Sequence, residues 1–259
     1  MNTEPKKSLG QYWLTDRESL EAICDIAKVG ANDTVLEIGP GHGSLTKHLL
    51  ARGAKVIAVE YDETLIENLR KNLAGDVEFE HADIRHYDFN RLPPDHKLIA
   101  NIPYYLTSYL IRLLTDGKHN KPAIVALLIQ KEVAQRIAAS PGDMSLLSVF
   151  AQYYYEVSLG IIVPAGLFTP PPKVDSQVLC LVRRPEPLFT NISAEDFFRV
   201  VRAGFSQRRK TLVNNLKSGL YLSKDKAAAI MYNCKLDPSI RAQALTIENW
   251  HSVALKAIE

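Results

Sequence analysis

The stretch that decides the fold is Thr34-Val35-Leu36-Glu37-Ile38-Gly39-Pro40-Gly41-His42-Gly43. A short apolar run ends in three glycines at alternate positions, and a helical pattern follows at residues 45–50. Glycines at such a turn let the backbone bend sharply and approach a ligand closely. The pattern predicts a strand, a turn and a helix of the Rossmann type, and a glycine-rich turn without a ligand is the alternative.

Apolar runs and helical patterns alternate around this stretch. We expect a first helix capped by Asp16, and strands at residues 34–38, 55–59, 77–80, 98–100, 123–129, 157–163 and 174–182. Buried strands separated by helices indicate a mostly parallel sheet that is covered on both faces. The last two strands have no long helix between them, which predicts an antiparallel edge.

A second part of the chain begins near Pro185 and Pro187. Beyond these prolines the strand signals stop and short helices are predicted, so we expect an α/β domain at residues 1–184 and an all-α domain at residues 185–259. Residues 1–182 contain 18 Lys and Arg against 22 Asp and Glu, whereas residues 183–259 contain 13 against 7. The basic second part indicates a polyanionic partner.

The composition is that of a globular protein: 46% of the 259 residues are hydrophobic and 23% are charged. The sequence has no run of about 18 apolar residues that would span a membrane, and residues 1–14 lack the apolar core of a signal peptide. Three scattered cysteines have neither metal-ligand nor redox spacing. We therefore expect a cytoplasmic protein with no membrane partner.

Carboxylates follow the next two predicted strands. Glu60 ends the second strand, about 20 residues after the glycines, where an acid suits the hydroxyls of a ribose. Asp83 follows the third strand and can accept a hydrogen bond from an adenine amine. Either residue alone could be an ordinary strand-end carboxylate. Together at the ligand-binding edge of an open sheet they predict a ligand that contains adenosine.

The motif that decides the chemistry is Asn101-Ile102-Pro103-Tyr104-Tyr105, after the fourth strand. It offers a side-chain carbonyl, a backbone carbonyl and an aromatic ring on which a base can stack. The lone pair of an exocyclic amine is delocalised into the ring of its base. When two carbonyl oxygens accept hydrogen bonds from the amine, its nitrogen moves toward a tetrahedral form in which the lone pair can attack. A proline turn with core tyrosines is the alternative.

Six blocks of sequence together resemble the small-subunit ribosomal RNA adenine dimethyltransferase family. They are the glycine motif continued through Thr46, Asn101–Tyr105, and residues 7–11, 130–133, 168–176 and 205–212. That family converts two adjacent adenosines near the 3′ end of the RNA to dimethyladenosines. The resemblance implies a Rossmann-like S-adenosylmethionine-dependent methyltransferase that acts on the small ribosomal subunit, and we expect a monomer.

The resemblance also implies roles for individual residues. The methyl donor S-adenosylmethionine would contact Tyr12, Leu14, Gly39, Gly41, Glu60, Tyr61, Asp83, Ile84 and Asn101. Asn101 and Pro103 would serve the target amine, and Tyr104 and Phe168 would stack on a flipped adenine. One departure is that Tyr12 and Trp13 stand where the family usually has Asn or His followed by Phe or another apolar residue.

The expected chemistry needs alignment rather than a nucleophilic side chain. The methyl group of the donor is already activated, so we expect no metal. The target adenine must be flipped out of its stack or lie in a loop, because a base inside a helix cannot present its amine. Arg208, Arg209 and Lys210 are expected to bind RNA phosphates, with a solvated surface as the alternative. Phe197, Phe198 and Phe205 are expected to pack the core of the second domain.

Three other functions remain open on the sequence alone. The erythromycin-resistance methyltransferases of large-subunit RNA share the glycine and Asn-x-Pro-Tyr motifs, but they do not usually carry the basic segment at residues 207–210. A non-catalytic ribosome-assembly factor is disfavoured by the intact residues 101–104. A nicotinamide oxidoreductase is disfavoured because Ser44 stands where the third glycine of the dinucleotide fingerprint belongs.

Overall fold

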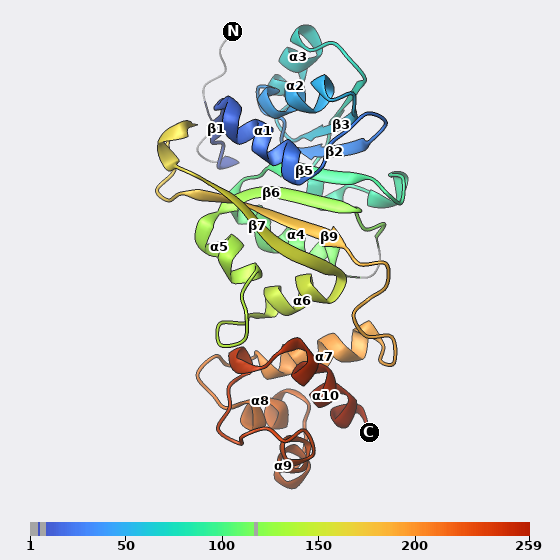
Figure 1. The fold of residues 1–259 in the computed structure, drawn as a ribbon, viewed down its shortest axis with the longest axis vertical. Coiled ribbons are helices and arrows are strands. Elements are labelled where there is room, and N and C mark those ends of the chain that lie inside the picture. The colour runs from blue at the N-terminus through green and yellow to red at the C-terminus, as the bar shows by residue number, and fades with distance from the viewer. Residues whose placement is uncertain (1–4, 6–8, 117–118) are drawn as a thin grey trace. The chain divides into compact units, whose positions relative to one another are not determined.

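The computed structural model describes residue 5 and residues 9–116 and 119–259. Its α-helices and strands, most of them labelled in Figure 1, are β1 (Trp13–Leu14), α1 (Arg17–Ile26), β2 (Thr34–Ile38), α2 (Ser44–Ala51), β3 (Lys55–Glu60), α3 (Glu63–Asn72), β4 (Val77–His81), β5 (Lys97–Asn101), α4 (Thr107–Leu114), β6 (Ile124–Gln130), α5 (Lys131–Ile137), α6 (Leu146–Tyr154), β7 (Tyr155–Val163), β8 (Phe168–Thr169), β9 (Ser176–Arg183), α7 (Ala194–Gly204), α8 (Leu212–Gly219), α9 (Lys224–Asn233) and α10 (Ile247–Ile258).

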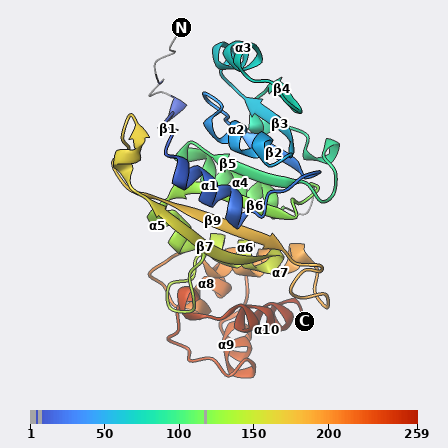
Figure 2. The same cartoon turned by 45° about the horizontal axis from the view of Figure 1, so that its top comes forward.

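Seven strands form one sheet in the order β4-β3-β2-β5-β6-β9-β7. The first five run parallel, and β9 runs antiparallel to β6. Figure 2 shows β9 between β6 and β7. The expected antiparallel strand therefore lies one place in from the edge, because the short connection from β7 to β9 returns the chain beside β6.

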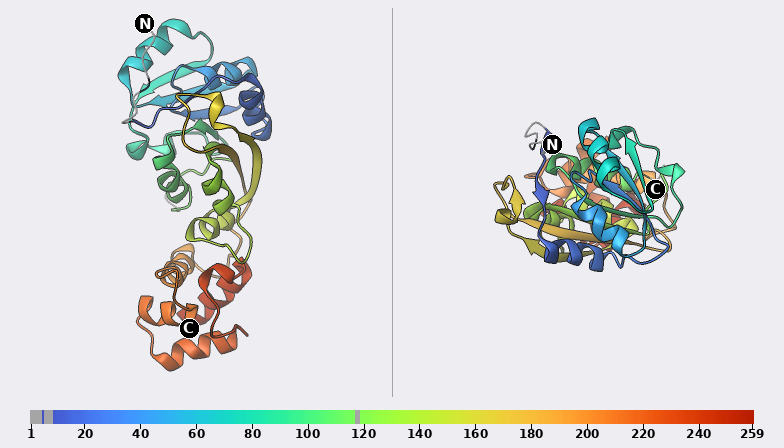
Figure 3. Two further views of the ribbon diagram at one scale, coloured as in Figure 1. Left: turned by 90° about the vertical axis from the view of Figure 1, so that its left-hand side faces the viewer. Right: turned by 90° about the horizontal axis from the view of Figure 1, so that it is seen from above.

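The sheet is buried because its central strands are mostly apolar. Residues 125–129 of β6 are all 0% exposed. Figure 3 shows α1 in dark blue and α4 in green on opposite faces of the sheet. Both faces are covered, as the continuous apolar runs predicted.

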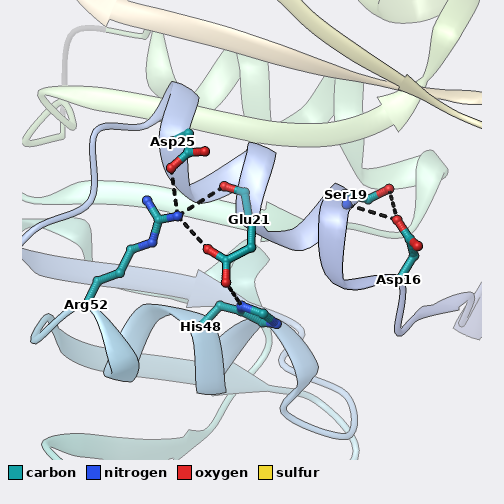
Figure 4. A network of polar contacts seen from close by, with 6 residues as sticks. All are labelled: Asp16, Ser19, Glu21, Asp25, His48 and Arg52. Atoms are coloured by element: carbon teal, nitrogen blue, oxygen red, sulfur yellow. Dashed lines mark hydrogen bonds and ion pairs between the residues drawn. The ribbon is translucent and has the colours of Figure 1, made fainter.

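A polar network joins α1 to α2 at the surface of this sheet (Figure 4). Glu21 accepts from Arg52 Nη2 at 2.6 Å and bonds His48 Nδ1 at 2.9 Å, and Asp25 pairs with the same Nη2 at 2.7 Å. The Asp16 carboxylate accepts from the Ser19 backbone N–H at 2.9 Å, which confirms the predicted helix cap.

The chain divides into two compact units, residues 1–134 with 157–183 and residues 135–156 with 184–259. The second unit therefore includes residues 135–156, which contain α6, in addition to the C-terminal part of the chain. The domain boundary after residue 184 stays a prediction. Its core contains Phe197 at 0% and Phe198 at 4% exposure, and Phe205 stacks on Trp250 with centroids 5.1 Å apart. These phenylalanines pack as expected.

Candidate active site

The candidate site lies where the strand order reverses, between β2 and β5. The chain runs from β2 outward to β3 and β4 and then crosses to β5 on the other side of β2, so the carboxyl ends of β2 and β5 border a crevice. A cavity of about 260 Å³ opens there, and the described residues that line it come from positions 9–106 of the first unit. They include the predicted Tyr12, Leu14, Gly39, Gly41, Glu60, Tyr61, Asp83, Ile84, Asn101, Pro103 and Tyr104.

The glycine turn keeps open space at its start. Gly39 has φ +68°, a left-handed conformation that favours glycine, and a Cβ built there would meet no atom within 4 Å. Gly43 has φ +78°, and its Cβ would lie 2.5 Å from Leu73 Cδ1. Gly39 therefore leaves room for a ligand, whereas Gly43 allows α2 to begin close to α3.

Glu60 is a buried carboxylate held by backbone groups. It is 7% exposed, and it accepts from the N–H groups of Tyr61 and Asp62 at 2.9 Å each and of Gly41 at 3.3 Å. Burial raises the pKa of this carboxyl, and the three N–H donors oppose the rise. A carboxylate has about four acceptor positions, so one remains for a hydroxyl of a ligand. The expected ribose contact fits this residue.

Asp83 is already engaged by Arg85. The Arg85 side chain donates to both carboxylate oxygens at 2.5–3.0 Å, and the Arg85 backbone N–H donates at 2.9 Å. These bonds lower the pKa of Asp83. The expected bond to an adenine amine thus requires Arg85 to release an oxygen, a competition that the strand-end pattern did not reveal.

Asn101 ends β5 with its amide oriented by the chain near the N-terminus. Its Nδ2 donates to the Tyr12 carbonyl at 3.0 Å, which leaves Oδ1 as an acceptor. The Pro103 carbonyl accepts from Leu106 N–H at 3.0 Å within a short turn. The carbonyl of the neighbouring Ile102, a residue that also lines the cavity, is a further candidate acceptor that the sequence analysis did not single out.

The two predicted stacking residues lie in different surroundings. Tyr104 lines the cavity, and its hydroxyl bonds Ser176 Oγ at 2.8 Å. Phe168 is 3% exposed and is not among the described residues that line the cavity. It pairs with Leu14 in the two-stranded β1–β8 sheet and belongs to the core cluster there. The structure thus buries Phe168, and its contact with an adenine stays a prediction.

Glu37 is a further charged residue in the site, and the sequence analysis did not single it out. It is 1% exposed and lines the cavity beside Glu60. Burial raises the pKa of Glu37 to about 8, and the neighbouring Glu60 adds to the rise. An acid inside an otherwise apolar strand was the available signal. No cluster of three metal-binding side chains occurs in the part of the chain that the structure describes.

The basic segment lies in the second unit. Arg208, Arg209 and Lys210 are exposed in the turn between α7 and α8, and none of them makes an ion pair with a described carboxylate. Lys7 and Ser8, from the first of the six blocks, lie outside the described residues. No described helix is long and apolar enough to cross a bilayer.

Comparison with known proteins identifies the family. The model of the family described as ribosomal RNA adenine dimethylase matches residues 2–259. The chain belongs to the ribosomal RNA adenine dimethylase family. Its fold is accordingly that of an S-adenosylmethionine-dependent methyltransferase, and the chain is an enzyme.

Named relatives and solved structures agree with this family. The chain is 39% identical to ribosomal RNA small subunit methyltransferase A of Dehalococcoides mccartyi strain CBDB1, covering 97% of this chain and 88% of that protein. The corresponding Moorella thermoacetica protein is 41% identical, with 96% and 91% covered. A Plasmodium falciparum dimethyladenosine transferase has a TM-score of 0.80 at 26% identity, with 93% and 96% covered. The structure of the 23S rRNA methyltransferase ErmE has a TM-score of 0.75 at 26% identity, covering 95% of this chain and 100% of that chain.

Proposed function

We propose that this dimethylase transfers methyl groups from S-adenosylmethionine to the exocyclic amines of two adjacent adenosines near the 3′ end of small-subunit ribosomal RNA. The single observation that carries the proposal is the convergence of Gly39, Glu60, Asp83 and Asn101 on one cavity at the ends of four neighbouring strands. The names of the relatives from Dehalococcoides mccartyi and Moorella thermoacetica support the small subunit as the substrate.

The donor would be held by the glycine turn and the strand-end acids. Gly39 offers open space for close approach, Glu60 offers a buried acceptor for a ribose hydroxyl, and Ile84 and Asp83 border the place for the adenine. When bound, S-adenosylmethionine supplies an activated methyl group on a sulfonium. Tyr61, 57% exposed, would cover the rim of this site.

The target amine would be polarised by two acceptors from one segment. Asn101 Oδ1 is free to accept because Nδ2 is bonded to the Tyr12 carbonyl, and the backbone carbonyl of Ile102 or Pro103 supplies the second acceptor. The adenine must leave its stack to reach them, and it would lie on Tyr104. The chain's contribution is alignment and polarisation, and the amine proton leaves to water.

Substrate binding would extend to the second unit. The exposed cations at residues 208–210 would neutralise RNA phosphates, which is binding by charge and shape rather than by base sequence. The domain division after residue 184 and a monomeric, cytoplasmic enzyme without a required metal belong to the same proposal.

The test is transfer of a labelled methyl group to unmethylated small subunits, followed by mass analysis of the nucleosides. Dimethyladenosine is expected from small subunits and not from large subunits. Asn101→Ala is expected to abolish transfer while subunit binding persists. Transfer to large subunits instead would identify the resistance-type activity, and no transfer at all would favour an assembly factor.

A further inference from the structure

Tyr12 contacts both of the groups that would handle the target adenine. Its carbonyl accepts from Asn101 Nδ2 at 3.0 Å, and its ring stacks on Tyr104 with centroids 5.6 Å apart and planes 26° apart. Both tyrosines line the cavity. One residue therefore orients the amide and covers part of the stacking platform.

The surroundings hold Tyr12 and Tyr104 in this arrangement. Tyr12 directly precedes β1, whose Leu14 pairs with Phe168 of β8, and both partners are 3% exposed. The Tyr104 hydroxyl bonds Ser176, which is 0% exposed. The stack is thus anchored at both ends by buried groups.

The spacing of the two rings excludes a base between them. A base stacked on both rings would separate their centroids by roughly 7 Å, twice the usual carbon–carbon contact distance of about 3.5 Å. The observed separation is 5.6 Å. An adenine can therefore stack only on the face of Tyr104 that Tyr12 leaves uncovered.

We propose that Tyr12 is a positioning residue for methyl transfer, whose ring restricts the target adenine to one face of Tyr104 and whose carbonyl turns Asn101 Oδ1 toward the target amine. The inference rests on the proposed function, because it assumes that an adenine is the methyl acceptor. The carbonyl contact survives substitution of the side chain, so side-chain variants test the ring alone.

The variants are Tyr12→Leu, which keeps apolar bulk without a flat ring, and Tyr12→Phe, which keeps the ring. Loss of the Tyr12 ring removes an aromatic stacking contact, and the usual free energy of such a contact corresponds to a fall in kcat of about 2- to 12-fold. Tyr12 also lines the donor cavity, so kcat is measured at saturating S-adenosylmethionine. We expect this fall in Tyr12→Leu with small subunits as substrate, and recovery in Tyr12→Phe. An unchanged kcat in Tyr12→Leu at saturating donor, or a fall in Tyr12→Phe as large as that in Tyr12→Leu, overturns the proposal.

A second measurement is independent of methyl transfer. Protein labelled with 3-fluorotyrosine gives a ¹⁹F resonance for Tyr104, assigned with Tyr104→Phe, and adenosine is titrated as the probe. We expect adenosine to shift this resonance in the wild type, with a Kd about 2- to 12-fold higher in Tyr12→Leu. If wild-type protein methylates no subunit, the proposed function fails while this titration still decides the inference. The inference is refuted if the Tyr104 resonance shifts neither on addition of adenosine nor in Tyr12→Leu.

Discussion

Replacing Glu60 with Gln perturbs the donor site with the smallest change of shape. The carboxylate is 7% exposed and accepts three backbone N–H groups. Gln keeps one oxygen, which can still accept from Tyr61 and Asp62, so the turn after β3 is retained. The second oxygen becomes an NH2 group, so Gly41 N–H loses its acceptor. The acceptor for a ligand hydroxyl passes from a charged to a neutral group.

The structure sets the size of the expected effect. A hydrogen bond to a charged group contributes about 1.5–3 kcal/mol and a neutral one about 0.5–1.5 kcal/mol, so Glu60→Gln should lose about 1–1.5 kcal/mol of donor binding. The Kd for S-adenosylmethionine should rise about 5- to 13-fold. Glu60→Ala loses the whole bond, a rise of about 13- to 160-fold, and it also leaves N–H groups unsatisfied at about 1–3 kcal/mol of stability each.

Calorimetric titration measures the Kd, and urea unfolding shows whether each variant is folded at the assay temperature. Because burial raises the pKa of Glu60, the wild-type advantage over Glu60→Gln should grow as pH rises through that pKa. The Gln variant should lack this dependence. An unchanged Kd in a folded Glu60→Gln protein would refute the reasoning and place the ribose elsewhere.

Three further predictions follow from the same geometry. Burial raises the pKa of Glu37 from an ordinary 4.5 to about 8 in the folded protein. Its contribution to the free energy of unfolding is therefore full below pH 4.5 and is lost as pH rises to about 8, by at most roughly 5 kcal/mol. In urea unfolding, Glu37→Gln should flatten this dependence of the free energy of unfolding on pH. Gly43→Ala should lower the free energy of unfolding by about 2–4 kcal/mol, because Gly43 has a positive φ and the added Cβ would lie 2.5 Å from Leu73. Gly39→Ala should lower it by only about 1–2 kcal/mol, because its Cβ meets no atom, but it should weaken donor binding in calorimetry. Changing the cations at residues 208–210 to Gln should flatten the salt dependence of small-subunit binding, and an unchanged slope would mean that they do not touch phosphate.

Local sequence predicted most of the sheet. The expected strand at residues 34–38 coincides with β2, because an apolar run closed by glycines is a signal within a few residues. The β1–β8 pair was not predicted, since two strands of two residues each have no periodicity, and the paired residues Leu14 and Phe168 are 154 positions apart in the chain. Short elements made by long-range pairing leave no local pattern.

The candidate site was predicted through its position rather than its contacts. Parallel strands end at one edge, so Glu60 and Asn101 could be placed together from the strand order alone. The Arg85 bonds to Asp83 and the burial of Phe168 could not be predicted, because they depend on side-chain conformations and on depth in the folded chain. The same holds for the Tyr12 contact with Asn101.

The sequence by itself determined the Rossmann-like sheet, the adenosine-binding edge and the resemblance to an RNA adenine dimethyltransferase, because each depends on residue order along a strand, a turn or a motif. Only the tertiary structure decided which acceptors stay open and which face of Tyr104 is covered. Those properties arise from contacts of Tyr12 with Asn101 and Tyr104, and of Tyr104 with Ser176. Such contacts between distant segments exist only once the chain is folded.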